Sequence, residues 1–261
     1  MSLKSKIVYQ LANFFLQNNF FNEISNFFKN KNSLIIFDIG CYEGDFSEKI
    51  LKLLKEKIKK IYLFDINKKV ENYLPLSLKK NKNIKFLNLG FTNKKGSGYY
   101  YLNTLFESAG TSISNLVSED KKWVNSRNLL LRFLYKKKIN FLKKKVQTST
   151  LDFFVKKNKI TNIDILKVDI EGAENEFIEG AANTLKSNKI KVFILEILGK
   201  KKSFNIKEKK IIKFLAKNNF ILFKKKKILS ISFLSDINKN DPKIASEEVV
   251  ANSYMFPHGT L

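Results

Sequence analysis

Short apolar runs alternate with longer amphipathic segments along most of the chain. Continuous apolar runs are typical of strands buried on both faces of a parallel sheet, and segments with a period of three to four residues are typical of helices. The predicted strands lie at 34–38, 61–65, 84–89, 163–169, 192–198 and 220–223, with terminal strands that include 252–256. The predicted helices lie at 46–57, 67–79, 173–187 and 206–217. This alternation predicts an α/β fold with a doubly wound, mostly parallel sheet.

Two regions interrupt the alternation. Residues 1–32 are a predicted N-terminal helical segment, because their basic start leads into an amphipathic pattern without a signal-peptide cleavage site. Residues 116–146 are a predicted basic helical insertion, which follows a turn at 96–98 and an extra strand. The stretch 149–152 reads as a capping box that opens a helix. With only three prolines and no repeat, residues 33–261 are predicted to form one domain.

The formal net charge of +25 changes this picture little. Only Arg127 and Arg132 are arginines among the 49 basic residues, and lysine, asparagine and isoleucine are abundant throughout, as expected for codon bias toward A and T. Nucleic-acid-binding proteins usually favour arginine, so a nucleic-acid partner is not expected. Attraction to an acidic substrate or an anionic membrane surface is compatible with the charge. Because no run approaches the roughly 18 apolar residues that span a bilayer, we expect a cytoplasmic protein, with a peripheral position at the inner membrane face as an alternative.

The scarcity of cysteine and histidine narrows the chemistry. Cys41 and His258 are the only residues of their types. Their scarcity excludes an intrachain disulfide, a thiolate metal cluster and the usual serine–histidine triad. Proton transfer would therefore fall to carboxylates, tyrosine or lysine.

A glycine turn follows the first predicted strand and ends near Ser47. Gly40 and Gly44 permit a tight turn and the close approach of a ligand at the carboxyl end of the strand. The turn is surrounded by the carboxylates of Asp38, Glu43 and Asp45. These would repel the pyrophosphate of a dinucleotide, which needs bare N–H groups. They suit S-adenosylmethionine (SAM), whose ammonium and sulfonium groups are cationic. The alternative is that the acidic residues only stabilise the helix N-terminus.

Two further residues indicate adenosine binding. Asp65 ends the second predicted strand, where a carboxylate can accept hydrogen bonds from both ribose hydroxyls. NAD enzymes place an acid similarly, so Asp65 does not identify the cofactor. Asn88, near the end of the third strand, is either a reader of the adenine edge or a turn residue.

A second acidic cluster follows the strand at 163–169. Asp169 ends that strand, Glu171 and Glu174 begin the next helix, and Glu196 lies near the end of the next strand. Crowded carboxylates raise one another's pKa values, which favours a general base. Asp169 and Glu171 could alternatively hold a divalent cation through oxygen ligands. A third interpretation is that Glu171 and Glu174 only satisfy the helix N-terminus.

The glycine turn at Asp38-Ile39-Gly40 and the stretch Leu166-Lys167-Val168-Asp169-Ile170-Glu171-Gly172-Ala173-Glu174 together resemble the FkbM family of SAM-dependent methyltransferases. Supporting matches are Gly44, Ser47, Ser149-Thr150-Leu151-Asp152, Gly180-Ala181 and Leu195-Glu196. The resemblance covers roughly residues 34–200. The family commonly has Ala-Asn where this chain has Cys41-Tyr42, and Glu-Pro where it has Asp65-Ile66.

The resemblance implies a class I methyltransferase (Rossmann-like) fold with a seven-stranded sheet. It also implies O-methylation, often of sugar hydroxyls in glycan biosynthesis. By position, SAM would be held by Asp38, Gly40, Gly44 and Asp65. Asp169 and Glu171 would then line the methyl-transfer site, and the acceptor would be a small molecule or a glycan.

The segment 121–145 carries ten basic residues and no acid, with apolar residues interleaved. This pattern predicts a basic amphipathic helix that covers the acceptor, touches an anionic membrane, or simply packs on the domain. Two other functions stay open. One is an NAD-dependent Rossmann oxidoreductase, and the other is a non-enzymatic, basic protein that binds nucleic acid or membranes.

Overall fold

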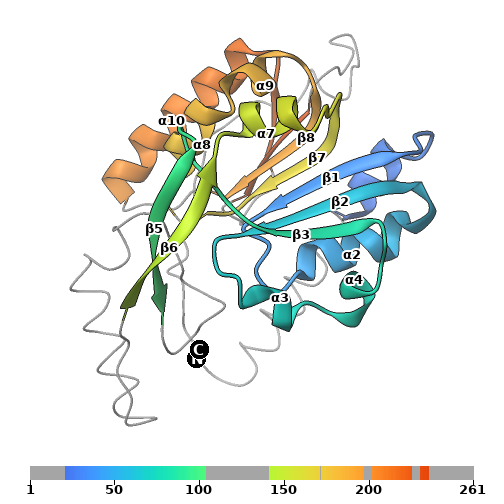
Figure 1. Ribbon diagram of the computed structural model, residues 1–261. Helices are drawn as coiled ribbons and strands as arrows, with labels where there is room; N and C mark the ends of the chain where they lie inside the picture. Colours follow the sequence, from blue (N-terminus) through green and yellow to red (C-terminus); the bar gives the residue numbers. More distant parts are fainter. Residues whose placement is uncertain (1–20, 104–140, 171, 197–200, 225–229, 235–261) are drawn as a thin grey trace, which may run out of the picture.

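The computed structural model describes residues 21–103, 141–170, 172–196, 201–224 and 230–234. Its centre is a seven-stranded sheet in the order β3-β2-β1-β7-β8-β10-β9 (Figure 1). The strands are β1 (Leu34–Ile39), β2 (Ile58–Asp65), β3 (Ile84–Asn88), β7 (Ile163–Val168), β8 (Ile190–Glu196), β9 (Ile221–Lys224) and β10 (Ser230–Leu234). The five strands from β3 to β8 are parallel, and β10 is antiparallel to β8 and β9. The predicted mostly parallel α/β sheet is therefore confirmed. The predicted strand at 252–256 lies outside the described residues.

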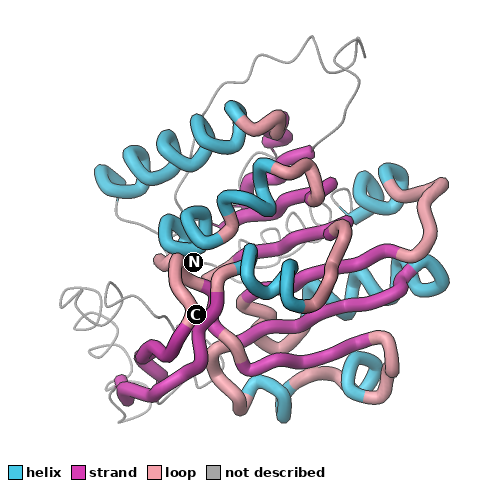
Figure 2. Tube along the Cα trace, turned by 45° about the horizontal axis from the view of Figure 1, so that its top comes forward, coloured by secondary structure: helices cyan, strands magenta, loops and turns pink. Residues whose placement is uncertain are grey.

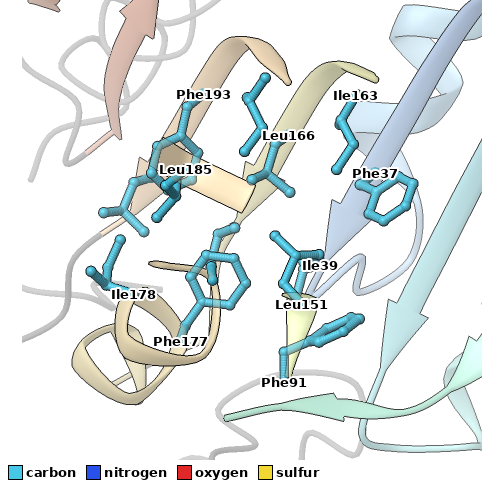
Figure 3. Close-up of a cluster of buried hydrophobic side chains, with 14 of the residues drawn as sticks. Phe37, Ile39, Phe91, Leu151, Ile163, Leu166, Phe177, Ile178, Leu185 and Phe193 are labelled. Atoms are coloured by element: carbon cyan, nitrogen blue, oxygen red, sulfur yellow. The ribbon is translucent and has the colours of Figure 1, made fainter. Parts of the chain in front are cut away.

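Each buried strand contributes to two hydrophobic cores, because successive side chains point to opposite faces of the sheet. On one face, Phe37 and Leu166 pack against Phe177 and Leu185 from the helices above them (Figure 3). On the other face, Ile36 and its neighbours pack against a second set of helices. Helices thus lie on both sides of the strands, as Figure 2 shows. This two-sided burial explains why the strands read as continuous apolar runs.

Three of the predicted helices are shorter or interrupted in the structure. The helices that pack under β1 and β2 are α2 (Asp45–Leu54), the 3-10 turn η1 (Lys55–Lys57), α3 (Val70–Tyr73) and α4 (Leu76–Lys79). Pro75 divides the predicted helix 67–79, because it lacks an N–H and forces the preceding residue into an extended conformation. On the opposite face lie α7 (Leu151–Lys157), α8 (Glu174–Gly180), α9 (Ala182–Lys186) and α10 (Lys201–Lys217). The predicted capping box is present in part, since the Thr150 hydroxyl accepts a hydrogen bond from Phe153 N–H at 3.0 Å.

A second sheet of three strands was not predicted. It contains β4 (Gly90–Phe91), β6 (Phe141–Ser149) and β5 (Gly96–Asn103) in that order, with β5 and β6 antiparallel. Residues 141–146 of the predicted helical insertion 116–146 are therefore strand, which corrects the helix prediction there. The physical reason is the continuous antiparallel pairing of these residues with β5, from Phe141 opposite Asn103 to Val146 opposite Gly98. Val146 is buried with Tyr100 and Leu102, which anchors this end of the pair. Residues 116–140 lie outside the described part of the chain.

The N-terminal segment is described from residue 21 onward, and residues 21–27 are helical. Ile24 and Phe28 are buried in the core beneath β1 and β2. Among the described residues, no helix is long and apolar enough to cross a membrane.

Candidate active site

The predicted site residues gather at the carboxyl ends of four neighbouring strands. Asp38 lies near the end of β1, Asp65 ends β2, Asp169 follows β7, and Glu196 ends β8. Strand order reverses between β1 and β7, because β2 and β3 extend the sheet to one side and β8 to the other. Ligands in open parallel sheets bind at such a switch point.

The glycine turn is held by the protein's own backbone. The N–H groups of Gly40 and Cys41 both donate to Phe64 O, at 2.9 and 3.1 Å, and Asp169 N–H donates to Ile39 O at 2.9 Å. Gly40 has φ +72°, and a Cβ on it would lie 1.7 Å from Asp169 O. The sequence suggested that the missing side chain lets a ligand approach. The structure shows that it lets the backbone at Asp169, just after β7, pack against the turn.

Gly44 has a similar internal role. Its φ is +86°, and a Cβ would lie 2.6 Å from a methyl carbon of Leu78 and 3.0 Å from one of Leu74. The turn between α3 and α4 therefore packs directly under the glycine turn. Both glycines fix the shape of the loop from within.

Asp65 is nearly buried and faces the same turn. One carboxylate oxygen accepts Asn67 N–H at 2.8 Å, and the other accepts Tyr42 N–H at 3.2 Å. Tyr42 reaches this position with φ +50°, the left-handed region that bulky residues rarely adopt. Burial raises the pKa of Asp65 to about 6, against the lowering effect of these N–H groups. The carboxylate is thus ionised at neutral pH and oriented by the loop.

Asp38 and Ser47 support the loop from below. Asp38 is fully buried, and one of its oxygens accepts the Ser47 hydroxyl at 2.7 Å. Burial raises the pKa of Asp38, while the charge of Lys167 and the bond from Ser47 oppose that shift. Burial also raises the pKa of the Cys41 thiol well above its usual value, with the charge of Asp38 adding to the effect. Cys41 is therefore a packed thiol and not a nucleophile.

Lys167 is the site residue that sequence reasoning missed. Its Nζ donates to Gly40 O at 2.8 Å and to Asp169 Oδ2 at 3.3 Å, and it lies 3.4 Å from Asp38 Oδ1. Its side chain is only 14% exposed. The available signal was a lysine inside an otherwise apolar strand, since buried lysines are rare unless they are paired.

The remaining predicted residues fall into different positions. Asp169 and Glu196 are half-buried at the strand ends, and the charge of Glu196 acts on Lys167. Glu174 is buried, and its carboxylate accepts Gly172 N–H at 2.7 Å, so it holds the turn before α8. Asn88 ends β3 and donates its amide to the carbonyls of Asp65 and Ile66 at 2.9 and 2.8 Å, so it links the ends of β3 and β2.

Two predicted residues have less definite positions. Glu43 is half-buried within the glycine turn. Glu171 lies outside the described residues.

Within the described part of the chain, no three His, Cys, Asp or Glu side chains are grouped so that they could hold a metal ion. The candidate metal pair of Asp169 and Glu171 therefore stays a prediction.

Residues 38–222 match the family described as Methyltransferase FkbM domain. No curated protein matches the chain. Among solved structures, the methyltransferase FkbM from Methylobacillus flagellatus KT is 10% identical with a TM-score of 0.48, over 78% of this chain and 43% of that one. M. capricolum TrmK in complex with S-adenosylhomocysteine is 15% identical with a TM-score of 0.40, over 83% and 67%. The precorrin-6y C5,15-methyltransferase from Geobacter metallireducens is 10% identical with a TM-score of 0.41, over 82% and 87%.

The chain spans less than half of the length of the Methylobacillus protein. At these TM-scores, the assignment to a family rests on the sequence match alone. That match extends from the glycine turn, through the acidic stretch after β7, to β9.

Proposed function

The chain belongs to the FkbM family of methyltransferases, and we propose that it transfers a methyl group from SAM to a hydroxyl group of a sugar, in a glycan, a glycolipid or a related metabolite. The observation that carries this proposal is the pair of carboxylates, Asp65 and Asp169, on either side of the glycine turn. One suits the donor, and the other suits the acceptor.

The hydrogen-bond acceptors and charges at the strand ends fit SAM. Each oxygen of Asp65 receives one backbone N–H and has a second lone pair for a ribose hydroxyl. The nearby cation, Lys167, is engaged by Asp38, Asp169 and Gly40, so it does not offer a phosphate site. The surplus of carboxylates favours a cationic cofactor over a dinucleotide.

In this proposal, the chain acts mainly by holding the cofactor and the acceptor hydroxyl in the geometry that methyl transfer requires. SAM supplies an electrophilic methyl group when bound. Asp65 would orient the cofactor, and the loop at Gly40 would fix its place beside the end of β7. Asp169 would accept the proton of the acceptor hydroxyl as the oxygen attacks, with Glu196 as the nearby second carboxylate.

The acceptor is expected to approach over the β5–β6 ribbon. Tyr100 on the inner face of this ribbon lies close enough to Asp65 for its pKa to be raised, first by burial and then by that charge. The outer face carries exposed lysines, including Lys143 and Lys145. An acidic or lipid-linked glycan would be attracted to such a surface.

Calorimetry with SAM and with NAD tests the cofactor assignment. We expect saturable SAM binding and none for NAD. The absence of SAM binding by folded protein would overturn the proposal, and NAD binding would favour a Rossmann oxidoreductase instead. Methyl-transfer assays against nucleotide sugars and lipid-linked glycans then test the acceptor class.

Two substitutions separate the proposed roles. Asp65→Ala should weaken SAM binding at least tenfold, because both ribose hydroxyls lose their acceptor. Asp169→Asn should leave SAM affinity nearly unchanged and lower the rate of methyl transfer about a hundredfold or more, as for loss of a general base. The reverse pattern would show that the two assignments are exchanged.

A further inference from the structure

Lys167 connects the two acidic motifs of the site. It stands in β7 opposite Asp38 of β1, and its Nζ reaches across the strand ends to Gly40 O at 2.8 Å. The same Nζ contacts Asp169 Oδ2 at 3.3 Å. We propose that Lys167 is a positioning residue that locks the cofactor loop to Asp169, so that cofactor binding and proton acceptance share one fixed geometry. This inference rests on the proposed function for the identity of the cofactor.

The charges around Lys167 suit this role. Burial lowers the pKa of Lys167, but the carboxylates of Asp38, Asp169 and Glu196 raise it more, so the net shift is upward. Lys167 therefore stays cationic and does not act as the base. Two of its three N–H donors reach Gly40 O and Asp169 Oδ2, and its charge forms an ion pair with Asp38 Oδ1 at 3.4 Å.

Two other contacts connect the same parts of the chain. Asp169 N–H donates to Ile39 O at 2.9 Å, and the Cα of Gly40 lies against Asp169 O so closely that no Cβ would fit. The loop after β1 and the turn after β7 are thus packed as one unit. Lys167 supplies the side-chain bond in this unit, and its ammonium is the group that orients the Asp169 carboxylate.

A simpler role is that Lys167 only neutralises the buried carboxylate of Asp38. The two roles can be separated with Asp38→Asn, Lys167→Met and the double variant. Lys167→Met alone leaves Asp38 charged and buried without its cation, which is strongly destabilising. The double variant removes that charge as well, while Gly40 O and Asp169 still lack their donor.

The experiment compares these three variants with the wild type and with Lys60→Met, a lysine in β2 whose Nζ donates to Lys82 O at 3.3 Å. The measurements are the melting temperature, the SAM dissociation constant from calorimetry, and hydrogen exchange in peptides covering residues 38–47 and α7. We expect the double variant to recover most of the stability lost in Lys167→Met. We also expect its SAM affinity to stay at least tenfold below that of Asp38→Asn, with faster exchange at 38–47 and unchanged exchange in α7.

A double variant with SAM affinity within threefold of Asp38→Asn, and with normal exchange at 38–47, would overturn the positioning role. Lys60→Met should match the wild type in every measurement. Failure of the wild type to bind SAM would count against the proposed function instead. In that case the hydrogen-exchange comparison still decides whether Lys167 fixes the loop.

Discussion

Gly40 occupies a position where the backbone leaves no room for a side chain. Its φ of +72° disfavours any side chain, and a Cβ would lie 1.7 Å from Asp169 O. We expect Gly40→Ala to lower the free energy of unfolding by about 3 kcal/mol or more, because left-handed strain costs ~1–2 kcal/mol and overpacking ~1–3 kcal/mol. Urea unfolding measures this change. Gly98→Ala is the control, since its Cβ would meet only a methyl group of Thr148 at 3.2 Å. Equal effects in the two variants would contradict the argument.

The pKa of Asp65, about 6, predicts how the free energy of unfolding depends on pH. The raised pKa means that the folded protein binds this proton more tightly than the unfolded chain does between pH about 4 and 6. The free energy of unfolding should therefore fall as pH rises through this range, by about 3 kcal/mol at 1.36 kcal/mol per pKa unit. Well above pH 6, Asp65 is ionised in both the folded and the unfolded chain, so its titration no longer changes the free energy of unfolding.

The Asp65→Asn variant isolates this effect, since it lacks the titrating group but keeps the other carboxylates. We expect its stability to depend less steeply on pH between 4 and 6 than that of the wild type, in thermal or urea unfolding at each pH. Parallel profiles for the two proteins would show that Asp65 is not the titrating residue.

For single residues, the place of a site residue at a strand end was easier to predict than the residues that it contacts. Asp65 and Asp169 were found from sequence because each acid ends an apolar strand. Lys167 was missed, because nothing in the sequence shows that it faces Asp38 on the adjacent strand. The contacts of Asn88 were missed for the same reason, since its amide bonds to two backbone carbonyls at the end of β2, more than 20 residues away in the sequence.

At the scale of elements, α9 depends on a carboxylate from another helix. Asp152 in α7 accepts hydrogen bonds from Asn183 N–H at 3.0 Å, Thr184 N–H at 2.7 Å and the Thr184 hydroxyl at 2.6 Å. We expect Asp152→Ala to destabilise the protein by about 2 kcal/mol, the upper range for a helix N-cap. Urea unfolding at pH 7 would measure this loss.

A matched control for Asp152 is Asp45→Ala, which removes an exposed acid from the first turn of α2. A helix-dipole interaction at an exposed position contributes only ~0.3–1 kcal/mol. A loss for Asp152→Ala no larger than for Asp45→Ala would show that its three bonds do not hold α9 in solution.

The elements themselves were predicted unevenly. The strands of the central sheet were predicted well, because burial on both faces leaves a plain apolar signal. Helix ends were predicted less well, since the predicted helix 173–187 is divided into α8 and α9 near Gly180. The close approach of Gly180 to Thr92, where a Cβ would lie 2.0 Å from Thr92 O, is a long-range contact that the sequence does not show. Residues 146–148 were predicted to be extended, but the first part of β6, residues 141–145, was taken for helix because its run of lysines beside Phe141 and Leu142 suits either period. Its pairing with β5 decides the outcome.

At the scale of the whole molecule, the charge is broadly distributed but the β5–β6 ribbon stands out. Its strands contain three lysines and no acid, and Tyr99 on its outer face is 53% exposed. Lys143 lies over the Tyr99 ring, with its Nζ 4.4 Å from the centroid. Exposed tyrosine beside lysine is suited to the interface of an anionic membrane, where the ring and the ammonium meet different layers.

We therefore expect the protein to bind vesicles of phosphatidylcholine with 30% phosphatidylglycerol, and not vesicles of phosphatidylcholine alone. Lys143→Glu with Lys145→Glu should weaken this binding more than Lys80→Glu with Lys82→Glu, which changes the net charge equally at exposed positions. Vesicle sedimentation at about 0.1 M salt, where the screening length is about 10 Å, measures both. Equal losses in the two variants would mean that net charge alone drives the association, and that the ribbon has no special part in it. Both losses should shrink at about 0.5 M salt, since the interaction is electrostatic.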